Sequence, residues 1–447
     1  MSYIPNKEKD RAKMMEYIGI SSVDELFDDI PQESRLKSEL DLPKPLTEIE
    51  VKKTMRNISN LNADTDKYTF FLGAGAYKHF IPSVVNHITR RSEFYTAYTP
   101  YQAEASQGSL QVIYEYQSMI CNLMGMDIAN ASMYDGATAM AEAANLAVHF
   151  TGRKKILVSK NVHPNYRRVL KTYANGAEFE VVEINYNENG QTQIGGLSHD
   201  VACLIVSNPN FFGSIEDLTT LSAETKKHGA LFIVSVDPIS LGLLKNPGQC
   251  GADIVVGEGQ CLGTPLSFGG PYLGLFAAKS NLLRFMPGRI AGKTTDHNGR
   301  EGYVLTMQTR EQHIRRERAT SNICSNEALV ALAASVYLSF LGDDGLKSIA
   351  KDCYNKSNYL KEKISKIPGY SIAFNSDSFK EFAVKVPIVP KTINAKLFKK
   401  GIIGGLDLGG FYPELKDHML FCVTEVVSKE EIDNLAQILA SLQIPHI

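Results

Sequence analysis

The stretch between residues 90 and 108, RRSEFYTAYTPYQAEASQG, combines side-chain types that a generic surface loop does not need. Its candidate pocket-lining or interface residues share a polar group at the end of the side chain: Tyr95, Tyr98, Tyr101, Gln102, Glu104, Ser106 and Gln107. Aromatic rings with polar tips beside amides and a carboxylate suit a cleft that holds a small polar molecule. The alternative is a surface loop whose tyrosines cover an edge of the core.

The flanking residues predict how this stretch is held. Pro100 ends any helix and biases Thr99 toward an extended conformation, so an ordered loop is predicted. A helix is predicted to follow from Gly108 and to stop at Gly125, because apolar residues recur every three or four positions between them.

A second group of residues could hold an anion. The small residues Gly136, Ala137 and Thr138 open another predicted helix, and a helix N-terminus presents unpaired N–H groups to an anion. The earlier pair Gly73 and Gly75 lacks a P-loop lysine and a dinucleotide fingerprint, so a structural turn is predicted there.

Short apolar runs alternate with helical or turn-rich stretches between residues 154 and 279. The runs are KKILVS, EFEVVEI, VACLIVS, ALFIVSV, ADIVVG and YLGLFAA. Runs that are apolar on both faces are typical of strands in a largely parallel sheet covered by helices. The fold class predicted from them is α/β.

Four regions are predicted along the chain. They are a helical arm (1–65), a large α/β domain with a mostly parallel sheet (66–320), a helical connection (321–367) and a small α+β domain (368–447). Capping boxes at Ser22 with Glu25 and at Thr47 with Glu50 support helices in the arm, and Ser428 with Glu431 supports a final helix.

Composition excludes several classes of function. The chain has 447 residues and a formal net charge of −2, so it has no basic surplus to hold nucleic acid or an anionic membrane. The sequence predicts no apolar run long enough to cross a bilayer, and the charged N-terminus does not resemble a signal peptide. A cytoplasmic location is therefore expected. Seven scattered cysteines, none spaced as C-x-x-C, indicate reduced thiols. No spacing of His, Cys and carboxylates predicts a metal site.

The arginine-rich run TREQHIRRERATSN, residues 309–322, could bind an anion. On a helix its arginines would point in different directions, and Glu311 and Glu317 offer partners. A network of salt bridges is therefore predicted.

Several long motifs resemble one family. EFYTAYTPYQAEASQG with QSMICNLMGMDIANASMYDGATAMAEA, GGPYLGLFAAK, LRFMPGRIAG and TREQHIRRERATSNICSNEAL are similar to the glycine decarboxylase, or P-protein, of the glycine cleavage system. The resemblance runs over almost the whole chain and is to the N-terminal half of single-chain P-proteins, which some organisms make as a separate α subunit. It implies the aspartate-aminotransferase-like fold (type I) of pyridoxal-phosphate enzymes, with a large α/β domain and a small C-terminal α+β domain.

The lysine that such enzymes need for a Schiff base with the cofactor is missing at its expected place. Gln260 or Cys261 occupies that place, and the nearest lysines are Lys245 and Lys279. The resemblance makes Asp237 a candidate for the residue that faces the pyridine nitrogen of pyridoxal phosphate, and His163 a candidate for a residue near that ring. Gly136, Ala137 and Thr138 match the turn that binds the phosphate group of the cofactor. Purely structural roles are the alternative for each of these residues.

The resemblance implies that the chain is subunit 1 of a decarboxylating glycine dehydrogenase. Pyridoxal 5'-phosphate would be attached to subunit 2 of an α2β2 tetramer, and the aminomethyl group of glycine would pass to the lipoyl arm (lipoate) of the H-protein. The T- and L-proteins would complete the system. Two alternatives are a scaffold subunit without side chains in the chemistry and an independent pyridoxal-phosphate enzyme that uses a displaced lysine such as Lys279.

Overall fold

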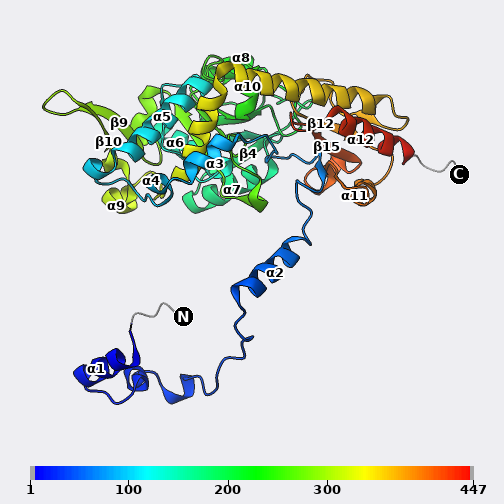
Figure 1. Ribbon diagram of the computed structural model, residues 1–447. Helices are drawn as coiled ribbons and strands as arrows, with labels where there is room; N and C mark the ends of the chain where they lie inside the picture. The colour runs from blue at the N-terminus through cyan, green and yellow to red at the C-terminus, as the bar shows by residue number, and fades with distance from the viewer. Residues whose placement is uncertain (1–5, 443–447) are drawn as a thin grey trace. The chain divides into compact units, whose positions relative to one another are not determined.

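The computed structural model describes residues 6–442, and the chain divides into two compact units, Met1–Ala63 and Asp64–Ile447 (Figure 1). The first unit contains α1 (Glu8–Ile18), η1 (Val23–Phe27), η2 (Gln32–Ser34) and α2 (Glu48–Ser59). None of these helices has a buried residue. This unit therefore has no core of its own.

Local signals set the helix ends in the first unit. Gly19, with φ of 85°, closes α1, and Thr47 with Glu50 forms the predicted capping box of α2. The box predicted at Ser22 and Glu25 is wrong, because Ser22 accepts a hydrogen bond from the Asp24 N–H and a short 3-10 turn forms instead.

A seven-stranded sheet forms the centre of the second unit. Its strands are β2 (Ile128–Ala129), β3 (Lys155–Ser159), β4 (Glu180–Ile184), β5 (Val201–Asn208), β6 (Leu231–Val236), β7 (Ile254–Glu258) and β8 (Gly274–Ala278). Their order is β2-β8-β7-β6-β5-β3-β4, and β8 alone runs antiparallel to its neighbours among these strands. All six predicted runs form strands; the two-residue β2, too short to leave a pattern, was missed.

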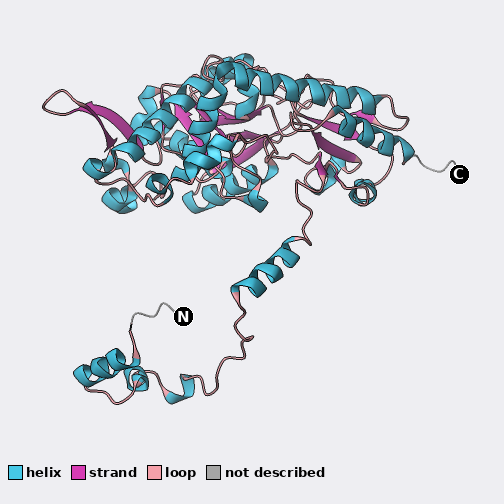
Figure 2. Ribbon diagram, viewed as in Figure 1, coloured by secondary structure: helices cyan, strands magenta, loops and turns pink. Residues whose placement is uncertain are grey.

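Helices cover both faces of this sheet (Figure 2). One face packs against α6 (Gly136–Thr151) and α7 (Pro164–Ala177), and the other against α5 (Gln107–Met124), α8 (Leu218–Lys227) and α10 (Ala328–Ser365). Alternate residues of each strand face the two resulting cores, which explains why the runs are apolar throughout.

A four-stranded antiparallel sheet forms the C-terminal part, in the order β11-β12-β15-β14. The strands are β11 (Ser371–Ile372), β12 (Glu381–Lys385), β14 (Leu406–Asp407) and β15 (His418–Cys422), with helices α11 (Pro390–Phe398) and α12 (Lys429–Ser441). The predicted capping box at Ser428 and Glu431 opens α12. A separate pair joins β1 (Thr69–Phe70) in parallel to β13 (Ile402–Ile403).

The helix α10 links the two sheets and is kinked at Gly342, where φ is 58°. Within residues 6–442 it is the one helix long and apolar enough, by length and composition, to cross a membrane. The expectation that no such run exists was therefore wrong. Its residues Ala331, Ala334 and Tyr337 are buried in the core of the second unit.

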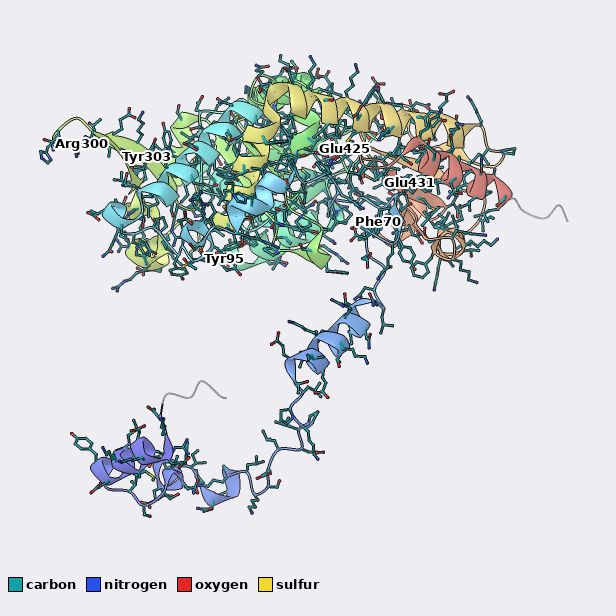
Figure 3. All side chains as sticks on the ribbon, in the orientation of Figure 1. Phe70, Tyr95, Arg300, Tyr303, Glu425 and Glu431 are labelled. Atoms are coloured by element: carbon teal, nitrogen blue, oxygen red, sulfur yellow. The ribbon has the colours of Figure 1, made fainter. Side chains whose placement is uncertain are left out.

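Short elements surround the tyrosine-rich loop. They are α3 (Ser83–Thr89), α4 (Ser92–Tyr95), η3 (Ala103–Ala105), the hairpin of β9 (Ile290–Thr295) and β10 (Glu301–Thr306), η7 (Gln308–Arg310), α9 (Gln312–Arg315) and η8 (Arg316–Arg318). Figure 3 marks Arg300 near the tip of the hairpin, which projects from the second unit. Further 3-10 turns are η4 (Pro238–Gly242), η5 (Ser267–Gly269), η6 (Ser280–Phe285), η9 (Leu408–Gly410) and η10 (Pro413–Leu415).

The arginine-rich run does not form the helix on which the salt-bridge prediction was based. Arg316 has φ of 54°, which breaks it into one-turn pieces. Arg310 is turned inward onto the carbonyls of Met286, Gly288 and Met307, while Glu317 pairs with Arg318 at 3.8 Å.

Candidate functional site

The predicted cofactor residues meet at the carboxyl ends of the parallel strands, where open α/β sheets bind ligands. Asp237 follows β6, Glu258 ends β7, and His163 caps α7 after β3. Together with Tyr77 and Lys380 they line a cavity of about 60 Å³. Sites for organic ligands have volumes of roughly 300–1,000 Å³, so this cavity is too small for a coenzyme.

Lys380 occupies the position opposite Asp237. Its Nζ lies 2.6 Å from Asp237 Oδ2 and 3.3 Å from the centroid of the Tyr77 ring, and the side chain is 2% exposed. Burial is the largest single influence and would lower the pKa of Lys380, but Asp237 together with the nearby Cys261, Cys422 and Cys353 raises it overall. The lysine is therefore a buried cation whose counter-ion is the aspartate predicted to face a ring nitrogen.

A polar network extends from this pair. Lys380 Nζ lies 3.3 Å from His79 Nε2, and His79 Nδ1 lies 2.7 Å from Glu425 Oε2. Burial and the neighbouring Lys380 lower the pKa of His79. The group His79, Cys353 and Glu425 has the ligand atoms of a metal site within 4.8 Å of one another, although sequence spacing did not predict it. The ammonium group of Lys380 beside His79 disfavours a second cation there.

The loop at residues 73–77 contacts the Nε2 edge of the His163 ring. His163 Nε2 lies 2.8 Å from the Ala74 carbonyl oxygen, and a Cβ at Gly75 would come within 2.8 Å of the same nitrogen. Glu381 ties the loop down, because it accepts hydrogen bonds from the Ala74 N–H at 2.6 Å and the Tyr77 hydroxyl at 2.7 Å. Burial raises the pKa of Glu381 to about 7. The Tyr166 ring stacks on His163 with ring centroids 4.8 Å apart, so the histidine already has an aromatic neighbour as well as a backbone partner.

Gln260, which stands where a Schiff-base lysine was expected, binds the same loop. Its side-chain amide accepts from the Tyr77 N–H at 2.9 Å and donates to the Tyr77 carbonyl at 3.0 Å. It also donates to the Thr264 carbonyl at 2.7 Å. The neighbouring Cys261 is buried, and burial raises the pKa of its thiol. Neither residue is placed to react with a ligand.

Glu258 occupies the predicted phosphate cradle at the start of α6. Its carboxylate accepts hydrogen bonds from the Gly136, Gln260 and Leu273 N–H groups at 2.9 Å each. Burial raises the pKa of Glu258 to about 7, although these three hydrogen bonds oppose the rise. Ala137 is buried, while Thr138 and Asp135 cap each other at the first turn of α6. A carboxylate of the chain itself thus satisfies the N–H group that would face a phosphate.

These residues do not fit pyridoxal phosphate, the cofactor that the fold implies. Each predicted cofactor residue already has a partner within the chain: Lys380 pairs with Asp237, the Ala74 carbonyl binds His163 Nε2, and Glu258 binds the Gly136 N–H. The position at which the resemblance places the Schiff-base lysine holds an amide.

The tyrosine-rich loop lies elsewhere on the second unit and lines a different cavity. Tyr95 belongs to the short helix α4, so the prediction of a loop without a helix holds only from Thr96 to Gln102, before the 3-10 turn η3 and the start of α5. Tyr98 is 91% exposed, and Figure 3 marks Tyr95 at the edge of the second unit. The Tyr101 hydroxyl accepts a hydrogen bond from Arg289 Nη2 at 3.2 Å.

The polar residues after Pro100 have two different roles. Gln102 and Glu104 are exposed and Ser106 is half-buried. Gln107 is the first residue of α5, one position before the predicted start, and it pairs with both backbone polar groups of Tyr303 on β10 at 2.8 and 2.9 Å. Gln107 therefore fixes the helix to the hairpin, while Gln102 and Glu104 face solvent.

Sequence analysis missed the residues that fill the small cavity, namely Tyr77, Glu258, Lys380 and Glu381. A signal was present for two of them: Lys380 and Glu381 are adjacent charges directly before the apolar residues of the run FAV. Glu258 follows the apolar run ADIVVG directly, at the end of a strand where ligand contacts are common.

Comparisons with known proteins agree over the full chain. The profile of the family described as glycine cleavage system P-protein matches residues 1–439. A probable glycine dehydrogenase (decarboxylating) subunit 1 of Desulforamulus reducens is 54% identical over 446 residues, covering 99% of this chain and 100% of the relative. A relative of the same description in Moorella thermoacetica is 52% identical, covering 97% of this chain and 98% of the relative.

Solved structures identify the fold. The crystal structure of glycine decarboxylase (P-protein) of the glycine cleavage system in inhibitor-bound form aligns with a TM-score of 0.92 at 40% identity, covering 99% of this chain and all of the other. Sphingosine-1-phosphate lyase of Burkholderia pseudomallei aligns with a TM-score of 0.65 at 14% identity, covering 92% and 94% of the two chains, which speaks for the fold alone. The fold is that of the type I pyridoxal-phosphate enzymes, as the resemblance implied.

Proposed function

The chain belongs to the glycine cleavage system P-protein family, and from this premise we propose that it is the cofactor-free subunit 1 of a decarboxylating glycine dehydrogenase. The curated relatives at about half identity have that description over their full length. The enzyme formed with subunit 2 would decarboxylate glycine and transfer its aminomethyl group to the lipoyl arm of the H-protein.

One observation supports the proposal that subunit 2 carries the cofactor and this chain does not. The residues that the resemblance assigns to pyridoxal phosphate have partners within this chain: Asp237 pairs with Lys380, His163 binds the 73–77 loop, and the Gly136 N–H binds Glu258. A chain with such a site must obtain its cofactor chemistry from another chain. Pyridoxal phosphate is accordingly assigned to a lysine of subunit 2.

The proposed partners follow from this assignment. They are subunit 2 in an α2β2 tetramer, the H-protein with its lipoate, and the T- and L-proteins of the same system. A cytoplasmic location is proposed, since all of these components must meet.

The contribution of this chain to the chemistry is proposed to be a wall of the partner's pocket. Loss of carbon dioxide from glycine leaves a carbanion that water would protonate, so the pocket must close and exclude water. Tyr95, Tyr98 and Tyr101 are exposed rings with polar tips, suited to covering such a pocket or the channel of the lipoyl arm. Glu104 lies exposed on the same loop.

The test is reconstitution of the enzyme from separate chains. Glycine–bicarbonate exchange should occur when this chain, subunit 2 and H-protein are mixed, and it should be absent from each chain alone. Exchange by subunit 2 and H-protein at the full rate would reduce this chain to a scaffold. Exchange by this chain without subunit 2 would contradict the proposal and favour an independent enzyme that uses Lys279.

A further inference from the structure

A buried arginine without an acidic partner lies beneath the tyrosine-rich loop. Arg289 is 5% exposed, and no ion pair in the part of the chain that the structure describes involves it. The other buried arginine, Arg167, differs because its guanidinium lies 2.8 Å from the carboxylate of Glu183. A buried charge is costly unless it is paired, so Arg289 calls for an explanation.

The hydrogen bonds of Arg289 leave part of its guanidinium unused. Its Nη2 lies 2.7 Å from the Cys324 carbonyl and 3.2 Å from the Tyr101 hydroxyl, and its Nη1 lies 3.4 Å from Asn326 Oδ1. The Nε is buried and has no hydrogen-bond partner. A guanidinium has five N–H donors, and at most three are engaged here.

This arginine lines a cavity of about 190 Å³ between the tyrosine-rich loop, α5 and the start of α10. Tyr95 and Tyr98 form part of its wall, Ser109 and Ser325 supply hydroxyls, and Val112, Ile113 and Leu332 supply an apolar floor. The volume suits a ligand of a few heavy atoms with one polar end and a small apolar end.

A second feature of the cavity also favours negative charge. Ala328 and Leu329, the first two residues of the 38-residue helix α10, line it, and no side chain caps that end of the helix. The N–H groups of an uncapped first turn carry partial positive charge and bind anions. Two independent sources of positive potential therefore converge on one small cavity.

We propose that this cavity is a binding site for a small carboxylate, with Arg289 and the first turn of α10 as its anion-binding groups. A carboxylate in the cavity could accept a charge-assisted hydrogen bond from the Nη1 N–H that Asn326 leaves unused. If the proposed function holds, the natural ligand is the carboxylate of glycine. The other source of the same chemistry is an acidic side chain of subunit 2.

The proposed role is capture of the substrate and not stabilisation of the transition state. An arginine that holds a carboxylate stabilises the ground state of that group, which disfavours its departure as carbon dioxide. The site is therefore one that glycine occupies on its way to the partner's pocket. A change that removes it should raise KM for glycine more than it lowers kcat.

The test uses the full chain alone and measures acetate binding by calorimetry at constant ionic strength, with methylammonium chloride as the comparison. Acetate and glycine should bind at one shared site, and methylammonium should not bind. Arg289→Met should weaken acetate binding at least about tenfold, because a charge-assisted hydrogen bond is lost. The matched control is Arg153→Met, since Arg153 likewise has no acidic partner among the described residues and donates to the carbonyls of Val201, His228 and Gly229, but lies outside this cavity. It should bind acetate as the native chain does.

A second variant covers the case in which Arg289→Met does not fold. Asn326→Asp is isosteric and places a carboxylate where Asn326 Oδ1 already approaches Arg289; it gives up the hydrogen bond from Asn326 Nδ2 to the Ala131 carbonyl but gains an ion pair with Arg289. It should abolish acetate binding while the chain stays folded. Acetate binding that is absent from the native chain, or unchanged in either variant, would overturn the proposal.

The same titration in the mixture with subunit 2 separates the two sources of carboxylate. If glycine competes with acetate in the mixture, the natural ligand is glycine. If mixing abolishes acetate binding and glycine does not compete, the assignment to glycine is wrong, and an acidic side chain of subunit 2 occupies the cavity. Acetate binding to the lone chain does not depend on turnover. A mixture that fails to decarboxylate glycine would therefore count against the proposed function, and acetate binding by the lone chain would still test the proposed carboxylate site.

Discussion

Replacing Lys380 by methionine should destabilise the second unit strongly. The change removes the ammonium group 2.6 Å from Asp237 Oδ2 and leaves a carboxylate that is 11% exposed without its counter-ion. Breaking a buried ion pair by removing one partner costs about 3–5 kcal/mol. The free energy of unfolding should fall by that amount in urea titrations followed by far-UV circular dichroism, which suits a chain without tryptophan.

Two further variants separate the ion pair from general packing. Asp237→Asn in the Lys380→Met background neutralises the stranded carboxylate and keeps the Oδ1 atom that accepts from the Ile239 N–H. It should recover most of the loss, since replacing both members of a buried pair is often nearly neutral. Lys279→Met is the matched control, because Lys279 pairs with Asp253 at 2.7 Å but is 36% exposed. That change should cost about 1 kcal/mol or less.

Either of two results would contradict the stabilising role of the Lys380–Asp237 ion pair. A Lys380→Met chain within about 1 kcal/mol of the native one would mean that solvent reaches Asp237 freely. A double variant no more stable than Lys380→Met would mean that the loss came from packing of the lysine and not from its charge.

Three more outcomes are expected. Because the pKa of Glu258 rises from an ordinary 4.5 to about 7 in the folded chain, its contribution to stability is full below pH 4.5 and is lost as the pH rises through 7, by on the order of 3 kcal/mol. Glu258→Gln should flatten the melting temperature over that range, and an unchanged pH profile would contradict the assignment. In the reconstituted enzyme, Tyr98→Ala and Glu104→Ala should each lower turnover while gel filtration still finds the complex. The control Phe340→Ala, which removes an aromatic ring that is 61% exposed, should leave turnover unchanged. Unchanged turnover in the loop variants would contradict the proposal that the loop forms a wall of the partner's pocket. Gln260→Lys should not confer pyridoxal-phosphate binding on the lone chain, because Lys380 and Glu258 still fill the site; stoichiometric uptake seen by absorbance would be evidence against that reasoning.

The sequence predicted the central sheet well because its information is local. Continuous apolar runs bounded by turns identify strands buried on both faces, and Gly125 or the pair Ser428 and Glu431 mark helix ends through their own backbone geometry. The short strand β2 and the hairpin β9–β10 were missed, because β2 has two residues and the hairpin faces are only half-buried.

The contents of the small cavity could not be predicted from the sequence in the same way. The absence of a lysine near Gln260 was visible, but Lys380 lies 143 positions after Asp237 and reaches it only through the packing of two sheets. The arginine-rich run was misread for a related reason: the left-handed conformation of Arg316 breaks a helix that its neighbours would otherwise favour. Ion pairs between residues far apart in the chain, and single residues with unusual backbone angles, produce no periodic pattern in the sequence.

The carboxylate of Glu258 at the start of α6 has a practical consequence for counting active centres. If both chains of the proposed tetramer could hold an aldehyde coenzyme, a carbonyl-trapping reagent such as hydroxylamine would titrate one equivalent per polypeptide. With this chain's anion cradle satisfied internally, the end point should fall at one equivalent for every two polypeptides. Preparations of the assembled enzyme should therefore be standardised per heterodimer, and a half-molar end point is full occupancy and not partial inactivation.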